Sequence, residues 1–444
     1  MASSVNFYPK INSDTKSIQI LVWLYFWLLI FEGALRKWIV PQLSTPLLII
    51  RDPVLIGVYF LALRQGLFKK NIFIKIIIFI AFITFLGGLL TVITSGSNLF
   101  ATLYGVRTNF LHLPLIFLMA KVFNKDDSLK IGKWILLLSL PMAVLMVFQF
   151  NAPPDAFINR TAGMGEGQQL SSAMGRIRPP GTFSFITGVA QYFALVAAFL
   201  FYGLFERKVY SNLLLTLAGF GLVIGLAVSG SRIAVAAVGV VLLFLLAILI
   251  IKPRLAAKSY QFFLIAGVIA VSLNFIPIFS EGIEVLSSRA EIAGAHEAKT
   301  GGFMARFLRS FLKPFENIEQ IPLLGHGLGM GTNVGAVLST GKLQFLLAEG
   351  EWERIVLESG LFLGLLYIML RILIAFWLGK VCIESVYTNN NILPLLIFGS
   401  CIIDILIGQF GTPSTLGFAV FGGGLCLAAC RDPLSKRMAK ESKN

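Results

Sequence analysis

Charged residues are scarce in this sequence: Asp, Glu, Lys and Arg make up only 13% of its 444 residues, whereas hydrophobic residues make up 57%. The scarcity of charge excludes the several soluble domains that the length alone would suggest. Stretches of about 20 mostly apolar residues, the length of a membrane-spanning helix, recur along almost the whole chain. We therefore predict an all-α polytopic membrane protein, with residues 1–444 forming a single transmembrane domain.

Cysteine and histidine are rarer still. The three histidines and the spacing of the four cysteines fit no zinc site and no disulfide framework, so we expect no metal ion and no other cofactor. We also expect no cleavable signal peptide, because residues 1–16 are polar and no small-residue cleavage pattern follows the first apolar run. The cysteines lie in or beside the last three apolar runs, at Cys382, Cys401, Cys426 and Cys430.

What the sequence does contain is a series of apolar runs with lysine-rich loops between them. The positive-inside rule puts these loops, such as "RQGLFKK" and "KPRLAAK", in the cytoplasm. Both termini then lie in the cytoplasm, which agrees with an even number of spans. The formal charge of +15 is thus attributed to topology and not to nucleic-acid binding. About twelve spans are predicted, at residues 17–36, 46–65, 71–93, 106–123, 131–150, 183–205, 211–228, 231–251, 259–279, 354–380, 391–410 and 412–430.

Two long loops are predicted on the external side, residues 151–182 and residues 280–353, the second between spans nine and ten. Within the larger loop, "GGFMARFLRSFLKPFENI" places its apolar residues on one helical face, with Arg306, Arg309 and Lys313 elsewhere. Such a helix either lies in the membrane interface, with its basic residues on lipid headgroups, or packs on the protein itself. The apolar face comprises Met304, Phe307, Leu308, Phe311, Leu312 and Phe315.

Arginines stand at external span ends, where topology does not require them and the positive-inside rule disfavours them. Arg107, and Arg232 in "SGSR", lie beside spans four and eight. Arg176 and Arg178 precede the Pro-Pro-Gly turn of "RIRPPGTFSF". A guanidinium keeps its charge and can donate two hydrogen bonds to one phosphate, which suits a diphosphate. The alternatives are a snorkelling lipid anchor for Arg232 and a brace of the loop for Arg178.

A glutamate cluster stands at the start of span ten, in "LAEGEWERIVLESGLFLGLL". On a helix, Glu349 and Glu353 would share a face. One such carboxylate could act as the general base on a sugar hydroxyl, whereas the alternative is a solvated helix start that acidic residues stabilise. Together with the arginines, the cluster suggests a lipid-diphosphate sugar donor in the membrane plane and an acceptor hydroxyl that arrives from outside.

Other polar residues give weaker indications. His112 is interpreted as a structural histidine, and Asp404 as an isolated acid that could carry a proton. The stretch "LLGHGLGMGTNVG" lacks the Gly-Lys-Ser/Thr ending of a phosphate loop, which argues against a nucleotide site. Four charged residues near the ends of the first two spans are expected to pair as buried opposite charges: Glu32, Arg36, Arg51 and Asp52.

Four segments within residues 175–380 carry a resemblance to a known family. "RPPGTFSFITGVAQYFAL" resembles a family motif that consists of an arginine, a Gly-Thr-Phe and a helix of small residues. "SGSRIAVAAVGVV" resembles a family Ser-Arg motif that is followed by an apolar span. "GHGLGMG" and "ERIVLESGLFLGLLY" are similar to a glycine-rich stretch and a Glu-x-Gly-Leu-x-Gly-Leu span after a large external loop. In this order they resemble the O-antigen ligase and O-antigen polymerase superfamily of bacterial surface-polysaccharide enzymes.

The resemblance implies an inverting, metal-independent glycosyltransferase of the bacterial inner membrane. Such an enzyme transfers a glycan from a polyprenyl-diphosphate carrier to an acceptor sugar. The resemblance also implies that Arg178 and Arg232, with Arg176 and Arg354 beside them, hold the diphosphate. The family often has a histidine base shortly before the motif glutamate, at the position that Glu349 occupies here. We therefore predict Glu349 as the base, with Glu353 as the alternative, and favour an exopolysaccharide polymerase over a ligase.

Two other functions fit a polytopic membrane protein. A transporter or flippase for a polar solute or a lipid-linked sugar should have repeated halves, broken spans at matched positions or a chain of acids at the midplane. The sequence does not show these features, whereas its candidate residues gather at one membrane face, as the enzyme requires. A structural membrane component is the third alternative.

Overall fold

The computed structural model describes residues 13–68, 71–163, 176–206, 208–253, 281–285, 287–288, 311–316, 319, 321–341 and 346–431. These residues form helices and loops, and none of them forms a β-strand, which confirms the prediction of an all-α fold. The α-helices are α1 (Ser13–Ala34), α2 (Arg51–Arg64), α3 (Ile72–Ser95), α4 (Leu99–Val106), α5 (Pro114–Val122), α6 (Lys125–Asn151), α7 (Ile186–Phe205), α8 (Asn212–Val228), α9 (Arg232–Ile251), α13 (Asn333–Thr340), α14 (Glu351–Asn389), α15 (Leu393–Ile407) and α16 (Pro413–Ala429). Two π-helical turns, η1 (Leu35–Ile39) and η4 (Arg107–Leu111), and the 3₁₀ turns η2 (Pro41–Leu43), η3 (Pro46–Ile49), η5 (Phe157–Asn159) and η7 (Lys313–Phe315) join them.

Most of the predicted spans are helices of the length and polarity that a membrane requires. Among the described residues, eight helical runs are long and apolar enough to cross a membrane, and three shorter helices, α8, α15 and α16, are apolar as well. These runs correspond to the predicted spans other than the ninth, residues 259–279, which lies outside the described residues. Multiple apolar helices of this kind indicate a multi-pass membrane protein.

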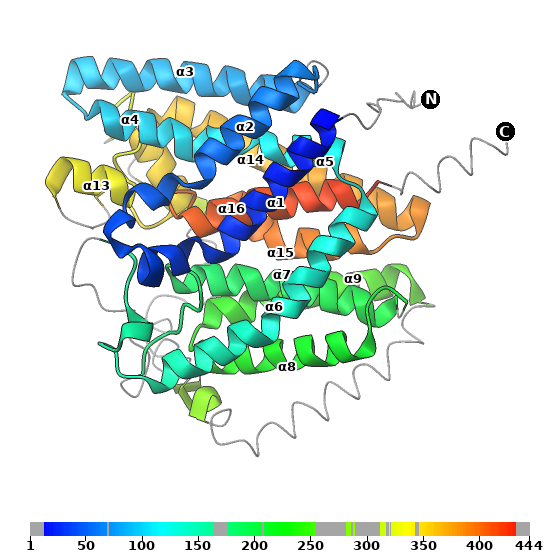
Figure 1. Cartoon of the computed structure of the whole chain (residues 1–444). Coiled ribbons are helices and arrows are strands. Elements are labelled where there is room, and N and C mark those ends of the chain that lie inside the picture. Colours follow the sequence, from blue (N-terminus) through cyan, green and yellow to red (C-terminus); the bar gives the residue numbers. More distant parts are fainter. Residues whose placement is uncertain are drawn as a thin grey trace, which may run out of the picture.

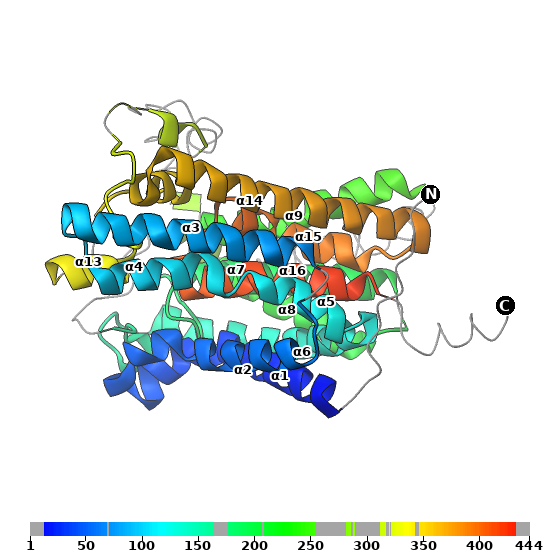
Figure 2. The same ribbon diagram turned by 90° about the horizontal axis from the view of Figure 1, so that it is seen from above.

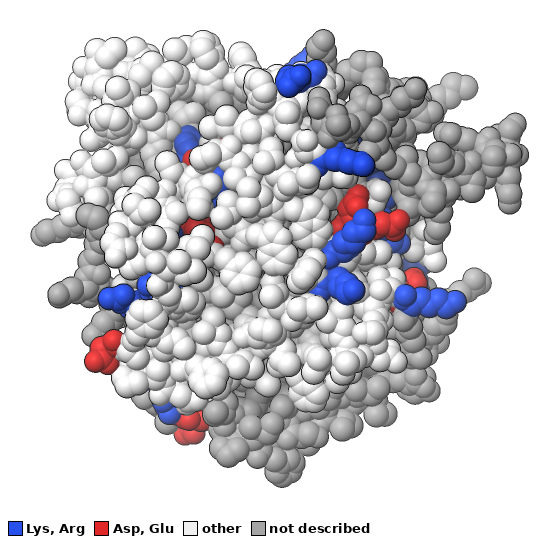
Figure 3. Space-filling model, viewed as in Figure 1, with Lys and Arg blue, Asp and Glu red and all other residues white. Residues whose placement is uncertain are grey.

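The helices lie side by side and alternate in direction, so that the loops gather at two ends (Figures 1 and 2). At one end, Gln19 Nε2 donates to the carbonyl of Val122 (2.6 Å), and the amide of Lys125 to the carbonyl of Arg431 (3.1 Å). At the other end, which we name the α13 end, the loops before α7, α9, α14 and α16 come together. On the face shown in Figure 3, charged atoms gather toward the first end, and a broad white band lies between the two ends.

Helices α7 and α16 form the centre of the bundle, because nearly all of their residues are buried. Both sequences are rich in Gly and Ala, which allow neighbouring helices to approach closely. At Gly424, for example, a Cβ atom would lie only 2.4 Å from the sulfur of Met119 in α5. By contrast, α3 and α9 bury only a minor part of their apolar residues, as expected of helices that face lipid.

The predicted fourth span, residues 106–123, is longer and less regular than the sequence suggested. Its helical run begins at Leu99, where the Asn98 side chain accepts hydrogen bonds from two amides of the first turn, at 2.8 and 3.3 Å, and so caps α4. The π-helical turn η4 then interrupts the run before Pro114 begins α5. Arg107 consequently lies inside this run and is mostly buried, instead of standing at the external end of a span.

Candidate functional site

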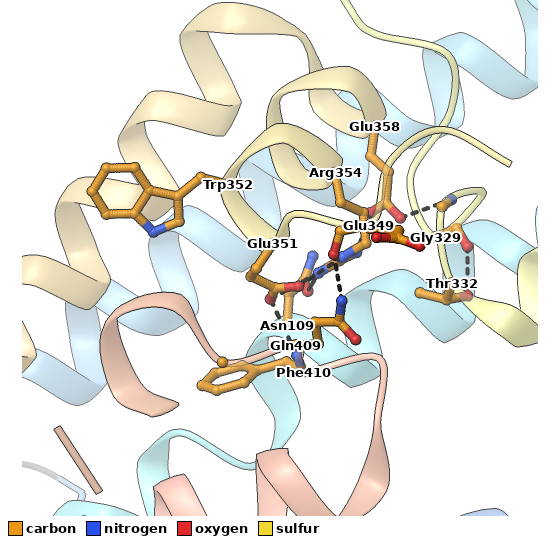
Figure 4. Close-up of polar contacts among 12 residues, drawn as sticks. Asn109, Gly329, Thr332, Glu349, Glu351, Trp352, Arg354, Glu358, Gln409 and Phe410 are labelled. Carbon is orange, nitrogen blue, oxygen red and sulfur yellow. Dashed lines mark hydrogen bonds and ion pairs between the residues drawn. The ribbon is translucent and has the colours of Figure 1, made fainter. Parts of the chain in front are cut away.

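A buried ionic cluster lies on α14; it consists of Glu351, Arg354, Glu358 and Arg371, and we name it the α14 cluster. Arg354 donates to both oxygens of Glu351, from Nε (2.9 Å) and Nη2 (3.0 Å), and its Nη1 lies 2.7 Å from Glu358 Oε2 (Figure 4). Arg371 Nη1 lies 2.7 Å from Glu351 Oε1. Two carboxylates and two guanidiniums balance in charge, which is the condition under which buried ions are tolerated.

The α14 cluster connects α14 to its neighbours. Arg354 Nη2 also donates to the Asn109 side chain of η4 at 3.1 Å, so every nitrogen of the Arg354 guanidinium has a protein partner. Arg371 donates to backbone carbonyls at the end of α15, where the helix leaves its last carbonyls unpaired. The cluster therefore holds α14 to η4 and to α15. The carbonyls that Arg371 contacts belong to Asp404 (2.9 Å), Ile405 (2.7 Å) and Gly408 (2.8 Å).

The glycine-rich stretch packs on a break in α14. At Gly360 the backbone has φ 78° and ψ 166°, a conformation that is accessible mainly to glycine. The amide of His326 donates to the carbonyl of Leu357 at 2.8 Å, a carbonyl that the break leaves available. The amide of Gly331 donates to Glu358 Oε1 at 2.9 Å. Two segments that resemble successive family motifs, far apart in the sequence, are thus in direct contact.

A shallow pocket of about 200 Å³ opens where the start of α14 meets the large loop. Glu353, in the first turn of α14, lies in its wall, and its Oε2 is 2.8 Å from Lys313 Nζ. The side chain of Glu353 is 17% exposed, so it faces the pocket without being surrounded by water. The wall combines polar and apolar side chains, among them Lys313, Glu316, His326, Ile321 and Leu357.

Glu349, the base that the sequence favours, lies apart from this pocket. The helix begins at Glu351 after the N-cap Gly350, so Glu349 and Glu353 do not share a helix face as expected. The Glu349 side chain is exposed, and its carbonyl accepts a hydrogen bond from Gln409 Nε2. Of the two predicted candidates, Glu353 is therefore the one whose carboxylate lines a pocket.

The predicted amphipathic helix is described only at its end, since residues 301–310 lie outside the described residues. Phe311 packs edge to face on Trp352 of α14, with ring centroids 4.9 Å apart. Leu312 and Phe315 expose 61% and 41% of their surface. At this end, one apolar side chain packs on the protein, and two are directed away from it.

The segment with the first pair of predicted donor-binding arginines is anchored at the α13 end. Arg176 binds Glu281 through Nε (2.8 Å) and Nη2 (2.5 Å), and its Nη1 donates to the carbonyl of Phe150 (3.3 Å). All three nitrogens of the Arg176 guanidinium are thereby engaged, which makes it a brace of the loop. Arg178, two residues further along, is half-buried.

Arg232 is the first residue of α9, directly after its N-cap serine, and it is half-buried. The end of α8, which leads into the turn before Arg232, lies against residues 281–285, because a Cβ atom at Gly282 would be 2.8 Å from the carbonyl oxygen of Ala227. Glu281, the neighbour of Gly282, is the partner of Arg176. The structure thus joins the Arg176 segment to the turn before Arg232 through these two residues.

A second buried ionic cluster joins α1, α2 and η4, and the sequence predicted only part of it. Glu32 pairs with Arg36 (3.4 Å) and with Arg51 (3.3 Å), as expected. Asp52 instead binds Arg107, at 2.7 and 2.8 Å, and also lies 3.1 Å from His112 Nε2. We name this group, which consists of Glu32, Arg36, Arg51, Asp52, Arg107 and His112, the N-terminal cluster.

The structure places the predicted site residues at the α13 end in different surroundings. Arg176 and Arg354 bind carboxylates, Glu353 pairs with Lys313 beside the pocket, and Arg178 and Arg232 are half-buried. Among the described residues, no group of three or more His, Cys, Asp or Glu side chains is arranged to hold a metal ion. Compared with known protein families and with curated proteins, the chain matches no family model and no curated protein.

Proposed function

We propose that the protein is a membrane-embedded glycosyltransferase, which transfers a glycan from a polyprenyl-diphosphate carrier to an acceptor sugar in the manner of O-antigen polymerases and ligases. The observation that supports this most is that the motif segments come into contact in two pairs, both at the α13 end. The glycine-rich stretch holds Glu358 beside the break at Gly360. Glu281 links the Arg176 segment to the turn before Arg232. Distant segments that converge with charged side chains are expected of an active site.

Arg178 and Arg232 bind the donor diphosphate in this proposal. Both are half-buried beside the ends of apolar helices, the level at which the headgroup of a lipid-linked sugar would lie. A guanidinium suits this role because its planar fork donates two hydrogen bonds to one phosphate. Arg176 and Arg354 already have a partner for each nitrogen, so we assign them to holding the site together.

Glu353 is the base that the geometry favours, although the sequence favours Glu349. A base must come within about 2.6–3.2 Å of the acceptor hydroxyl, and a pocket beside the carboxylate gives the acceptor a place to bind. The Glu353 carboxylate takes the hydroxyl proton, and the hydroxyl oxygen bonds to the anomeric carbon with inversion. The bond between that carbon and the diphosphate oxygen breaks, and the arginines stabilise the charge on the leaving diphosphate.

The proposal also requires about twelve spans, with the α13 end outside the cell and both termini in the cytoplasm. The bacterial inner membrane is the compartment that this orientation and the lipid-linked donor imply. Reporter fusions or cysteine accessibility should then place residues near 165 and 300 outside, and residues near 68, 127 and 255 inside. A cytoplasmic location for residues 280–353 would contradict the proposed site, because the acceptor could not reach it.

The arginine assignment is tested with variants of the purified protein and a lipid-linked donor. Arg178→Ala and Arg232→Ala should each abolish polymer formation while expression and membrane insertion remain. Lys at either position should restore activity only in part, because an ammonium lacks the bidentate fork. The matched control is Arg64→Ala, an exposed arginine at the opposite end of the bundle, which should keep full activity. Full activity of both alanine variants at the α13 end would remove the diphosphate role.

A second candidate function is transport or flipping of a lipid-linked sugar or a polar solute. It is favoured by two interrupted spans, at η4 and at Gly360, both of which lie beside buried charges. Interrupted helices often form substrate sites in transporters. Movement of the lipid-linked sugar across a proteoliposome membrane, with no glycan transferred when acceptor is supplied, would select this alternative over the enzyme.

A further inference from the structure

Lys37, in the π-helical end of α1, is fully buried, and no carboxylate among the described residues pairs with it. Its ammonium donates instead to two backbone carbonyls, those of Gly181 (2.6 Å) and Phe183 (2.8 Å), and lies 4.4 Å from the centroid of the Trp38 ring. Burial of an ammonium is unfavourable unless its donors are satisfied. Lys37 is therefore committed to one segment, residues 181–183.

Neighbouring residues of α1 hold the same segment. The hydroxyl of Thr182 donates to the carbonyl of Ile30 at 2.7 Å, and Arg36 Nη1 donates to the hydroxyl of Ser184 at 3.0 Å. At Gly33 the two backbones touch, since a Cβ atom there would lie 2.3 Å from the amide nitrogen of Ser184. The end of α1 thus holds residues 181–184 through side chains and through direct backbone contact.

The opposite side of the segment is held by the end of α6. The amide of Gly181 donates to Gln149 Oε1 (2.8 Å), and Gln149 Nε2 donates back to the Gly181 carbonyl (3.2 Å). Arg176 donates to the carbonyl of Phe150 (3.3 Å). Arg178 lies between these two attachments, which restrict the movement of its backbone.

We infer that Lys37 is a positioning residue for Arg178: through the carbonyls of Gly181 and Phe183 it fixes the segment that presents this arginine to the donor diphosphate. The inference rests on the proposed function, to which it adds a residue outside the four motif segments. A binding group displaced by about 1 Å can lose on the order of 100-fold in rate. Lys37 would therefore act on the donor without touching it.

The test compares Lys37→Met with Lys121→Met. Lys121 also donates to a loop carbonyl, that of Leu67, but at the opposite end of the bundle. We expect both variants to fold, and only Lys37→Met to weaken binding of a polyprenyl diphosphate, by about 10–100-fold. In an Arg178→Ala background, Lys37→Met should weaken binding no further. A loss of equal size in both backgrounds would overturn the inference, because a general structural defect acts independently of Arg178.

A measurement that needs no donor separates the inference from the proposed function. A spin label attached through Arg178→Cys should be immobile in the parent chain and mobile when Lys37→Met is added, with the chain lacking Arg178→Cys as the labelling control. Unchanged mobility would overturn the positioning role even if glycan transfer is demonstrated. Increased mobility in a protein that binds no lipid diphosphate would support the positioning of Arg178 by Lys37 and would overturn the donor-binding role of Arg178. If Lys37→Met does not fold, Thr182→Val removes one attachment and should raise mobility in the same direction.

Discussion

The two buried ionic clusters differ in charge balance. The α14 cluster holds two carboxylates and two guanidiniums; Glu351 is shared between Arg354 and Arg371, and Glu358 pairs with Arg354, at 2.7–3.0 Å. The N-terminal cluster holds two carboxylates and three guanidiniums, and Lys37 lies next to it. One cluster is neutral, and the other has a surplus of positive charge.

Cations of the N-terminal region also contact backbone carbonyls at the α13 end. Arg36 donates to the carbonyl of Ser44 (2.8 Å), Arg51 to that of Pro413 (2.5 Å), and Lys37 to two carbonyls of residues 181–183. In the α14 cluster each arginine pairs with a carboxylate, and Arg371 also donates to backbone carbonyls at the end of α15. Lys37 differs from these arginines, because no carboxylate among the described residues pairs with it. The comparison teaches that the α14 cluster mainly holds helices together, whereas the N-terminal region also fixes, through Lys37, the segment that carries Arg178.

Glu351→Gln should cause the largest change, because it leaves Arg354 and Arg371 buried with half of their negative partners removed. Breaking a buried ion pair by removing one partner costs about 3–5 kcal/mol of stability. The expected result is a large drop in melting temperature or a loss of folded protein in detergent. The control is Glu384→Gln, which removes an exposed pair with Lys380 (3.9 Å) and should change little. Equal melting temperatures for the two variants would contradict a stabilising α14 cluster.

Gly360→Ala tests whether the break in α14 is needed to place Glu358. The residue has φ 78°, and a Cβ atom would lie 2.0 Å from the carbonyl oxygen of Leu323, so backbone strain of about 1–3 kcal/mol adds to a steric clash. Gly239→Ala is the matched control, since no atom lies within 4 Å of its added Cβ in α9. Thermal unfolding should show a loss for Gly360→Ala and none for Gly239→Ala. If the Gly360→Ala protein were as stable as the parent, α14 would not need its break at residue 360.

Asp52→Asn tests whether the N-terminal cluster contributes less to stability than the α14 cluster. It leaves one mostly buried guanidinium, that of Arg107, without its carboxylate, whereas Glu351→Gln removes a carboxylate that two more deeply buried guanidiniums share. We expect a loss of about 1–3 kcal/mol, smaller than that of Glu351→Gln. Thermal unfolding of both variants shows which of the two substitutions costs more stability. A larger loss for Asp52→Asn would reverse the roles assigned to the two clusters.

Much of the fold follows from hydrophobic length, which is a local property of the sequence. Most spans were predictable because eight of the described apolar helical runs are long enough to cross a bilayer, and so was the pairing of Glu32 with Arg51. The start of the fourth span was predicted seven residues late, at 106 instead of Leu99, because the capping by Asn98 and the π-helical turn are weak signals in an apolar run.

The candidate site was less predictable, because it depends on contacts between distant segments. The contact of the glycine-rich stretch with Glu358 joins residues 27 positions apart, and no local sequence pattern predicts it. One signal was present in the sequence: the i, i+3 and i, i+4 spacing of Glu351, Arg354 and Glu358 indicates ion pairs on one helix. That spacing argues that Arg354 is committed to carboxylates and not to a phosphate.

Turnover by Glu353→Gln, beside Glu349→Gln as the matched control, tests the central claim most directly. The assay is polymer formed from a purified polyprenyl-diphosphate-linked glycan by the reconstituted protein, together with donor binding. We predict that Glu353→Gln loses most of its turnover while it still binds the donor, because only the proton acceptor is removed, and that the exposed Glu349→Gln keeps most of its activity. Near-normal turnover by Glu353→Gln, with loss in Glu349→Gln, would contradict the placement of catalysis in the pocket beside α14.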